Sequence, residues 1–473
     1  MPNQEQRRFG QPDSRTDTER LEDLRRIQRQ VRLIRTSRDD HAFAERFIAS
    51  VRERRAGRTN RTQFDVIPDK YGDNTLAAVT RRPGPEPGRP GELLIRADAL
   101  PAVSRLLAGY GLVDPSAREL GEPVTELGNR VVRLRGGQHD PIDLAHLAAN
   151  LRRQGVPISV NYMTPMGGFI KSGVASPEQT AGAAPAWPMA ADEQEGDQER
   201  ERSPVRVVII DTGVYGTRDD GWLAGLATKD NREDLDDFPP DGFLDLAAGH
   251  GSFCTGIVQQ IVPDAHIVVC KKLDSDGLAH ELRVARALVR EVRDGLDAGQ
   301  HVIVNLSFGA ETADDERPVA LGVALEIIDE ESRKAELETV VVAAAGNFGH
   351  DRPCYPAAFP TVTAVAALTQ GMLPAEWSSR GAWVDVSTIG EGVRSTFVPG
   401  TESPSIDYDF EEFPQDAWAL WSGTSFAAPQ VTGAIAKIAI EDGVTPTEAK
   451  RRLLAGAKEI PLYGKQVEIL PRI

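Results

Sequence analysis

The stretch V-R-V-V-I-I-D-T-G (205–213) decides the fold class of this chain. Residues 205–210 form a short β-branched run that is preceded by a proline and followed by Thr212 and Gly213. Such a run is typical of a strand that is buried on both faces of a parallel sheet. Asp211 closes the run. We therefore expect its carboxylate at the carboxyl end of a central strand, where open α/β sheets place their functional sites.

Two further runs have the same apolar character. They are H-V-I-V-N-L-S-F-G (301–309) and T-V-V-V-A-A-A-G-N (339–347), and each is typical of a buried strand. Parallel strands end at one edge of a sheet, so Asn347 should bring its side-chain amide to the edge that holds Asp211. An amide N–H in that position can stabilise an oxyanion.

Two polar residues stand where helices are expected to begin. His250 opens H-G-S-F-C-T-G, and residues 251–262 then follow with helical spacing of small and apolar side chains. Ser425 lies in G-T-S-F-A-A-P, ahead of the apolar run 426–440. A serine hydroxyl is a poor nucleophile at neutral pH and needs an adjacent base, which in turn needs a carboxylate to orient it. Asp211, His250 and Ser425 together indicate a serine-protease triad.

The order Asp, His, Asn, Ser and the motifs around each residue resemble the subtilisin-like (S8) serine peptidases over about residues 205–457. The resemblance implies a three-layer α/β fold with a mostly parallel central sheet. It makes Ser425 the nucleophile, His250 the general acid and base, and Asp211 the group that orients the imidazole. Asn347 and the Ser425 backbone amide would form the oxyanion hole. The structural alternative is a strand-end Asp, a helix-start His and a capping Ser, but four motifs in this order favour catalysis.

The same resemblance implies a pocket for the residue that precedes the scissile bond. The residues implied for its two walls are Ser307, Phe308, Gly309, Ala344, Ala345 and Gly346. Cys354 stands where typical subtilisins have a glycine at the pocket base, so its side chain should make the pocket shallower. We therefore expect cleavage after small to medium apolar residues.

The chain contains three cysteines, and this odd count without close pairs is typical of a reducing compartment. Cys254 follows His250 by one helical turn, so it should lie beneath the imidazole. A free cysteine there resembles the proteinase K branch of the family. A small buried hydrophobe is the favoured interpretation of Cys254, and Cys270 should belong to the core.

The part of the chain before the peptidase region divides at shifts in composition. The predicted segments are an Arg-rich helical segment (1–60), a Pro-rich linker (61–91), an α+β domain (92–172), a flexible linker (173–204) and the peptidase domain (205–473). The α+β domain alternates strands and helices in the manner of a ferredoxin-like sandwich. In size and position it resembles the inhibitory propeptide of subtilisin-like enzymes. A structural or substrate-docking domain is the alternative.

The N-terminal helical segment has an apolar face. Its members are Leu21, Leu24, Ile27, Val31 and Ile34. We expect this face to pack on a neighbouring domain. The alternative is an arm that binds a partner or nucleic acid, which the only mildly basic character of residues 1–60 disfavours.

Composition narrows the partners and the location. The 473-residue chain is 40% hydrophobic and carries a formal net charge of −17, which argues against nucleic acid as the main partner. No stretch approaches 18 apolar residues, and the start of the chain has no apolar signal region. We therefore expect a cytoplasmic location and no membrane partner.

Acidic residues gather in two stretches of the predicted peptidase domain. Segment 219–245 offers oxygen ligands for a structural calcium ion, although a solvated loop is the favoured interpretation. The acidic insertion 402–416 precedes Ser425 and could form a rim of the cleft. The chemistry itself requires no metal or other cofactor.

We expect a serine endopeptidase that hydrolyses a protein or peptide substrate through an acyl-enzyme intermediate. A processing or regulatory role is the favoured biological setting. The alternative function belongs to a different class. It is a protease-fold regulatory or binding protein in which residues 92–200 keep the triad silent until an activating protein partner arrives through the N-terminal region.

Overall fold

A computed structural model shows the arrangement of the chain. The residues that it describes are 9–10, 13–39, 48–49, 51–53, 55, 62–79, 91–117, 119–135, 139–165, 177–182, 203–216, 223, 225–226, 228, 230–237, 240–404 and 410–473. All structural statements below concern this part of the chain.

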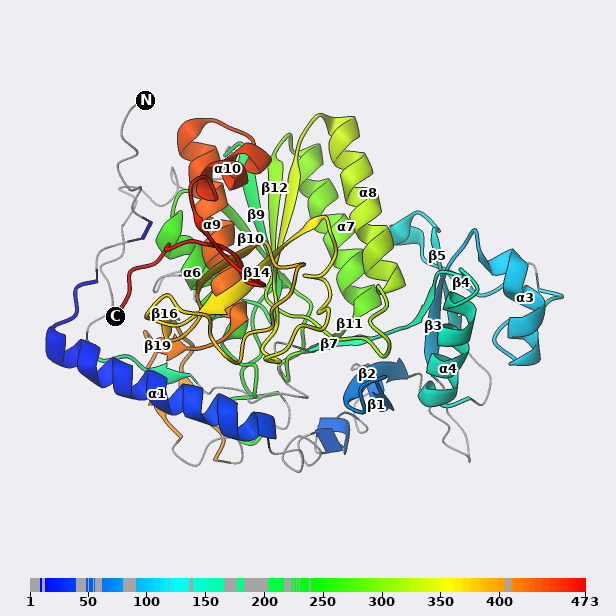
Figure 1. Ribbon diagram of the computed structural model, residues 1–473, viewed down its shortest axis with the longest axis horizontal. Coiled ribbons are helices and arrows are strands. Elements are labelled where there is room, and N and C mark those ends of the chain that lie inside the picture. The colour runs from blue at the N-terminus through cyan, green and yellow to red at the C-terminus, as the bar shows by residue number, and fades with distance from the viewer. Residues whose placement is uncertain are drawn as a thin grey trace.

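An eight-stranded sheet forms the centre of the molecule (Figure 1). Its strands in spatial order are β10 (His266–Lys271), β9 (Val205–Asp211), β12 (His301–Leu306), β13 (Thr339–Ala344), β14 (Val362–Leu368), β15 (Val386–Ile389), β21 (Gly464–Gln466) and β20 (Lys458–Ile460). Every pairing is parallel except that between β20 and β21. The mostly parallel central sheet predicted from the sequence is therefore confirmed.

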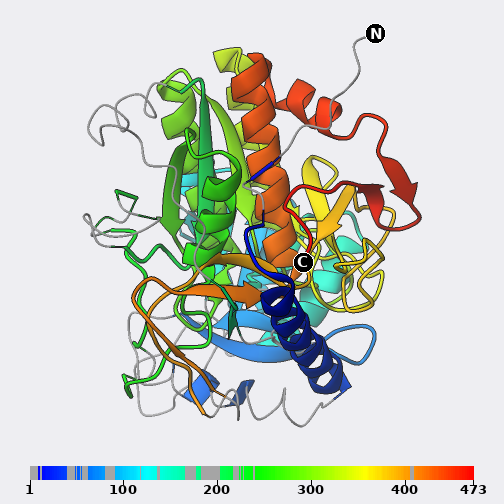
Figure 2. The ribbon, with the colours of Figure 1, turned by 90° about the vertical axis from the view of Figure 1, so that its left-hand side faces the viewer.

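Helices cover both faces of this sheet (Figures 1 and 2). They are α7 (Glu281–Asp297) and α8 (Val319–Ala335) on one face, and α6 (His250–Ile261) and α9 (Thr424–Asp442) on the other, with α10 (Pro446–Leu453) packed against α9. Strand β9 shows why both faces are apolar. Val207 and Ile209 lie in the core under α6 and α9, whereas Val208 and Ile210 lie in the core under α7 and α8.

The α+β domain forms a separate unit at the right-hand edge of Figure 1. Its elements are β3 (Glu92–Arg96), α3 (Leu100–Gly109), β4 (Glu122–Pro123), the 3₁₀ turn η1 (Thr125–Leu127), β5 (Val131–Arg135), α4 (Pro141–Arg152) and β6 (Ile158–Val160). The antiparallel order β4-β5-β3-β6 and the βαββαβ connectivity are those of the predicted ferredoxin-like sandwich. The domain has an apolar core of its own.

Two predicted linkers contain strands, so these predictions were wrong in part. Within 61–91, β1 (Gln63–Pro68) and β2 (Asn74–Val79) form an antiparallel hairpin. Within 173–204, β8 (Glu178–Gln179) pairs with a strand of the peptidase domain. Prolines, alanines and charged residues dominate both segments and obscure the short strands, and β8 in addition gains its pairing from a strand that is distant in sequence. The Pro-rich run 81–90 lies outside the described residues.

The N-terminal helix α1 (Asp17–Asp39) runs along the peptidase domain at the lower left of Figure 1. It packs beside a small antiparallel sheet made of β16 (Val393–Thr396), β19 (Trp418–Trp421) and β8. Contact with a neighbouring domain is therefore confirmed, but the predicted face is only partly correct. Leu21 is 51% exposed, whereas Asp23 and Gln30 are fully buried beside Ile27 and Ile34.

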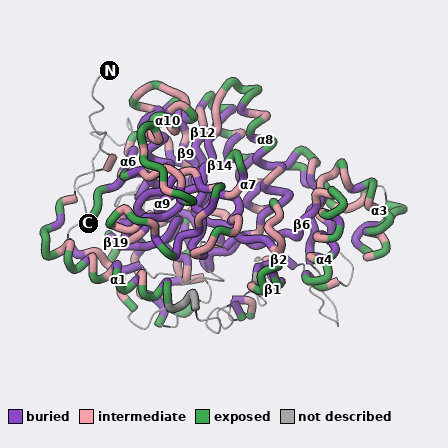
Figure 3. The backbone as a smooth tube through the Cα atoms, viewed as in Figure 1, coloured by how far each residue is buried: buried purple, intermediate pink, exposed green. Residues whose placement is uncertain are grey.

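Burial separates the parts of the molecule. The strands of the central sheet are almost continuously buried, while the outer faces of α1 and α3 are exposed (Figure 3). Among the described residues, no helix is both long and apolar enough to span a membrane.

The described parts of the two acidic stretches adopt local structure. Asp236 accepts hydrogen bonds from the backbone N–H groups of Asp241 and Gly242. Strand β18 (Glu412–Phe413) of the 402–416 insertion pairs with β17 (Gly400–Thr401), which directly precedes the insertion. The calcium ion stays a prediction, because these backbone bonds do not depend on a cation.

Candidate active site

The three predicted triad residues meet at the carboxyl edge of the central sheet. Asp211 ends β9, His250 begins α6, and Ser425 is the second residue of α9. His250 Nδ1 and Asp211 Oδ1 are hydrogen-bonded at 2.7 Å, and the backbone N–H of Thr212 donates to the same oxygen at 2.7 Å. A buried carboxylate in this position fixes the ring orientation and stabilises an imidazolium.

The Ser425 hydroxyl is held by a backbone group. It donates to the backbone carbonyl of Ser307 at 2.9 Å. His250 Nε2 has no hydrogen-bond partner among the described residues. The nucleophile and the base are therefore in one site, but the bond between them is not formed in this state. Catalytic hydrogen bonds often form only when substrate is bound.

Asn347 is oriented by the residue that precedes the serine. Its Oδ1 accepts from both the backbone N–H and the hydroxyl of Thr424, each at 2.9 Å. The Thr424 hydroxyl in turn accepts from the Gly346 backbone N–H at 3.0 Å. These contacts fix which end of the amide is the acceptor, so Nδ2 is left to donate. An oriented amide donor next to the nucleophile is what an oxyanion hole requires.

A family model for the subtilases matches residues 203–466, more than half of the chain. The chain belongs to the subtilase family. It is accordingly a serine peptidase of the S8 type.

Thermitase of Thermoactinomyces vulgaris is 29% identical over 244 residues, which are 49% of this chain and 74% of that protein. Subtilisin DY of Bacillus licheniformis is 27% identical over 278 residues, 55% of this chain and 87% of that protein. A solved lanthipeptide protease has a TM-score of 0.44 at 20% identity and covers 58% of this chain and 88% of its own.

Aromatic and sulfur groups surround the imidazole of this subtilase. The Trp421 and Phe426 rings lie 5.7 and 5.4 Å from the His250 ring, between centroids. The Cys254 sulfur, a His250 nitrogen and an Asp211 oxygen lie within 4.8 Å of one another. Burial raises the pKa of the Cys254 thiol, so this cysteine is a neutral group beneath the ring as predicted. The sequence analysis missed both aromatic residues, although W-S-G-T-S-F contains them.

A carboxylate next to the triad was also missed. Glu233 lies in the acidic stretch that was considered for calcium, but it is buried and hydrogen-bonded to Thr212, Gly249 and Ser252. Nothing in the sequence pattern separates it from its solvated acidic neighbours.

The implied pocket residues are brought together around Ser425, with one exception. The Ser307 hydroxyl donates to the Ser425 backbone carbonyl at 2.7 Å. Gly309 lies against Cys354, because a Cβ on this glycine would be 2.7 Å from the Cys354 sulfur. Phe308 is the exception, since its side chain lies in the core under α7 and α8. Only its backbone remains available to a pocket wall.

The wall on the side of β13 is also close to the site. Ala344 and Ala345 are buried at and after the end of that strand. Gly346 follows with a φ of +100°, and a Cβ there would be 2.9 Å from the Phe348 ring. A glycine is therefore required where the chain turns toward Asn347.

A segment from the N-terminal part of the subtilase lies along the edge of the site. Strand β7 (Met163–Pro165) pairs antiparallel with β11 (Leu278–His280). The Gly309 backbone N–H donates to the Pro165 carbonyl at 3.1 Å. The chain that leaves the α+β domain therefore reaches the pocket wall, and the residues that follow Pro165 lie outside the described part.

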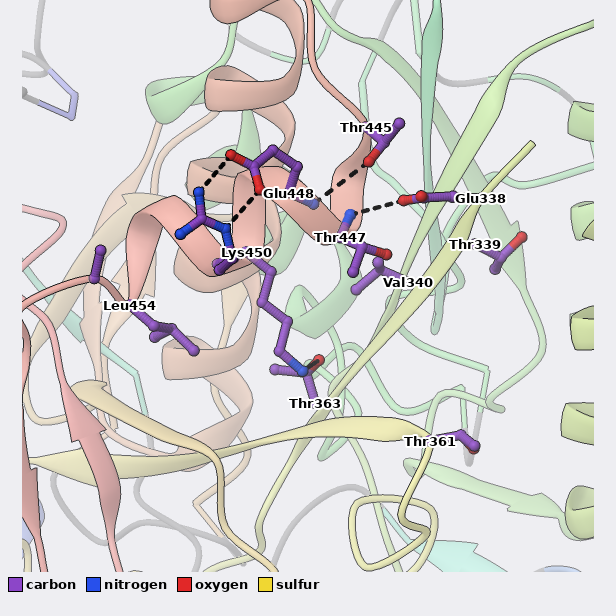
Figure 4. Close-up of a pocket in the computed structure, with 12 residues that line it drawn as sticks. Glu338, Thr339, Val340, Thr361, Thr363, Thr445, Thr447, Glu448, Lys450 and Leu454 are labelled. Carbon is purple, nitrogen blue, oxygen red and sulfur yellow. Dashed lines mark hydrogen bonds and ion pairs between the residues drawn. The ribbon is translucent and has the colours of Figure 1, made fainter. Parts of the chain in front are cut away.

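A second concave region lies far from this chemistry. It is a groove of about 890 Å³ between α10 and the starts of β13 and β14 (Figure 4). Its charged groups are already engaged: Glu338 accepts from the Thr447 backbone N–H, and Lys450 donates to Thr363. Since the triad lies at the carboxyl ends of the strands and this groove at their amino ends, the groove does not contribute to the active site.

Proposed function

We propose that this subtilase is an endopeptidase with Ser425 as nucleophile, His250 as general base and acid, and Asp211 as the orienting carboxylate. The observation that carries the proposal is the buried 2.7 Å contact between His250 and Asp211, at the sheet edge that also holds Ser425 and Asn347. Protein or peptide chains are the substrates.

The reaction divides between these groups. The Ser425 oxygen attacks the scissile carbonyl while His250 Nε2 takes its proton. Asn347 Nδ2 and the Ser425 backbone N–H donate to the resulting oxyanion. When the tetrahedral intermediate collapses, the imidazolium gives the proton to the leaving amine and an acyl-enzyme remains. A water molecule then repeats the sequence and releases the acid.

The pocket supports cleavage after small to medium apolar residues. Cys354 is fully buried against Gly309, and it introduces no charge at the pocket base. Cys354→Gly should improve hydrolysis after Phe or Tyr about tenfold, since the space occupied by the sulfur becomes available to the ring. A library of peptide substrates measures this. Dominant cleavage after Arg or Lys would contradict the pocket assignment.

A latched form is a second function that one observation favours. Strand β7 pairs with β11 beside the pocket, and Ser425 is only 3% exposed. In this interpretation the α+β domain keeps the triad silent until an activating partner, or a cut, displaces the segment.

Labelling with a fluorophosphonate distinguishes the two forms, because the reagent reacts only with an activated serine. The full chain should label, and Ser425→Ala should abolish both labelling and peptide hydrolysis while the protein stays folded. Turnover should fall by about 10⁶, the value known for subtilisin. Hydrolysis that persists in purified Ser425→Ala would exclude the assigned nucleophile. Labelling that appears only after removal of the α+β domain (92–172) would support the latched form.

A further inference from the structure

Glu233 connects the two segments that carry the catalytic dyad. Its carboxylate accepts from the Gly249 backbone N–H at 2.9 Å and from the Ser252 hydroxyl at 2.6 Å. It also accepts from the Thr212 hydroxyl. Thr212 directly follows Asp211, while Gly249 and Ser252 stand on either side of His250. One buried side chain therefore holds the segment of the carboxylate and the segment of the base.

The hydroxyls that donate to Glu233 are themselves fixed by backbone groups. The Thr212 oxygen accepts from the Gly251 N–H at 2.9 Å, and the Ser252 oxygen accepts from the Tyr215 N–H at 2.8 Å. Each hydroxyl accepts from the backbone and keeps its one proton to donate, and Glu233 is the acceptor within reach of both protons. Three donors, the Gly249 N–H and the two hydroxyls, then converge on Glu233, and such an arrangement stabilises an ionised carboxylate.

The backbone of the Asp211 segment lies so close to that of the His250 segment that no side chain fits between them at the glycines. A Cβ on Gly251 would lie 2.1 Å from the Gly213 carbonyl oxygen, and one on Gly213 would lie 2.5 Å from the Asn231 carbonyl. The Glu233 N–H also donates to the Val214 carbonyl at 3.0 Å. The dyad is thus set by backbone contacts and by a single acidic side chain that is 4% exposed.

We propose that Glu233 is a positioning residue of the catalytic centre, which fixes the Asp211 and His250 segments against each other and adds negative charge beside the imidazole. The inference rests on the proposed function. Unlike Asp211, Glu233 does not contact the ring. It acts through Thr212, Gly249 and Ser252.

The charge of Glu233 depends on pH near neutrality. Burial raises the pKa of Glu233 to about 7. The titratable groups that face it are Asp211 from β9, and His250 and Cys254 from α6. Its neighbour Asp234 is already paired with Lys271 at 2.6 Å. As pH falls through about 7, Glu233 takes up a proton and the carboxylate with three donors is lost.

The first test compares the full chain with Glu233→Gln, which keeps the shape and removes the charge. We expect kcat for a peptide substrate to fall about tenfold, less than for a group that touches the reacting atoms, with KM changed by less than about twofold. The rate of fluorophosphonate labelling should fall in the same proportion.

Glu291→Gln is the matched control, because Glu291 is a buried carboxylate on α7 that contacts Cys270 and Arg290 away from the triad. Its kcat should equal that of the unaltered chain.

The pH profile is a readout that a purely structural role would not change. In the unaltered chain Glu233 takes up a proton as pH falls through about 7, so kcat/KM should lose the contribution of this carboxylate on the acid side of that pH. In Glu233→Gln this group no longer titrates. The acid limb of log kcat/KM should therefore be less steep than that of the unaltered chain.

A second pair of variants covers the case in which Glu233→Gln does not fold. Thr212→Val removes the donor at the same size and should lower kcat in the same way. Thr212→Ser keeps the hydroxyl and should recover most of the loss.

Two results would overturn the inference. The first is a Glu233→Gln variant that keeps the kcat and the acid limb of the unaltered chain. The second is a decrease in kcat that is the same in Glu233→Gln and in the control Glu291→Gln. An unaltered chain that neither labels nor hydrolyses would instead contradict the proposed function.

Discussion

The two N-terminal parts of the molecule contact the peptidase domain in different ways. Helix α1 has no core of its own. Its residue Ile34 is 1% exposed and belongs to the main core, and Gln30 donates to the Leu420 carbonyl and accepts from the Ser422 hydroxyl, each at 2.7 Å. The α+β domain has a core of its own, but it also buries Leu94, Val124, Leu127 and Val131 in the core under α7 and α8. Partly exposed ion pairs with α8 border this contact.

Helix α1 therefore depends entirely on the peptidase domain, whereas the α+β domain has a core of its own as well as buried apolar contacts with α7 and α8. Asp23 of α1 is fully buried and accepts from the Thr180 hydroxyl at 2.8 Å and the Ala181 N–H at 2.7 Å, next to β8. Strand β8 pairs with β19, which leads into the turn before Ser425. The α+β domain, by contrast, contributes Arg96 and Arg130 to pairs whose side chains remain 29% and 38% exposed. Position in the sequence alone would place both parts in one removable region.

The largest effect should come from truncating the apolar contact of α1. Ile34→Ala should lower the free energy of unfolding of the peptidase domain by about 2–5 kcal/mol, because it opens a cavity in the main core. Urea unfolding followed by tryptophan fluorescence, in the Ser425→Ala background, measures this. Leu21→Ala on the same helix is the control and should change stability by less than about 0.5 kcal/mol. Equal effects would show that α1 is not part of the peptidase body.

A smaller loss is expected for the buried amide. Gln30→Ala leaves the Ser422 hydroxyl and the Leu420 carbonyl without this partner in a buried site, which should cost about 1–3 kcal/mol of unfolding free energy. Gln28→Ala is a matched control because Gln28 is exposed on the same helix. The same urea experiment measures both variants. If Gln30→Ala behaves like Gln28→Ala, the hydrogen bonds to β19 are not important for stability.

The smallest effect should be at the rim of the α+β domain. Arg96 and Arg130 contact Glu326 and Glu330 at 2.7 Å, and exposed pairs of this kind contribute little to stability because solvent and salt screen them. The double variant to Gln should loosen docking and speed fluorophosphonate labelling of Ser425 about threefold at low salt, with a smaller gain at high salt. Arg105→Gln, on the exposed side of α3, is the control. A double variant that loses folding stability as Ile34→Ala does would make the two interfaces equivalent.

Much of the fold could be predicted because its signals are local. The buried run that ends in Asp211 and the helix starts at His250 and Ser425 each follow from a short pattern, and so does the alternation of strands and helices in the α+β domain. The run 339–347 also placed Asn347 at the edge that holds Asp211, and the family resemblance then implied the pocket residues.

The sequence could not predict the hydrogen bonds that buried polar side chains form with partners distant in sequence. Gln30 and Asp23 interrupt the apolar pattern of α1, so helical periodicity selected Leu21 instead. Their partners include backbone and hydroxyl groups about 150 to 390 residues away, which only the folded chain brings close. Glu233 was missed for a different reason, because it stands among acidic residues from which the sequence pattern does not separate it. Phe308 was misplaced because a motif fixes the path of the backbone and not the direction of a side chain.

The packing of α1 against Gly392 restricts which residues evolution can place at this turn. Its φ of +56° is one that asparagine or aspartate can also adopt, but a Cβ there would lie 2.1 Å from Ile27 Cδ1. In this chain the helix, and not the turn alone, therefore excludes those residues. A subtilase that lacks such a helix is free to carry asparagine at the corresponding turn. Across the family, the residue in this turn should vary together with the presence of the helix.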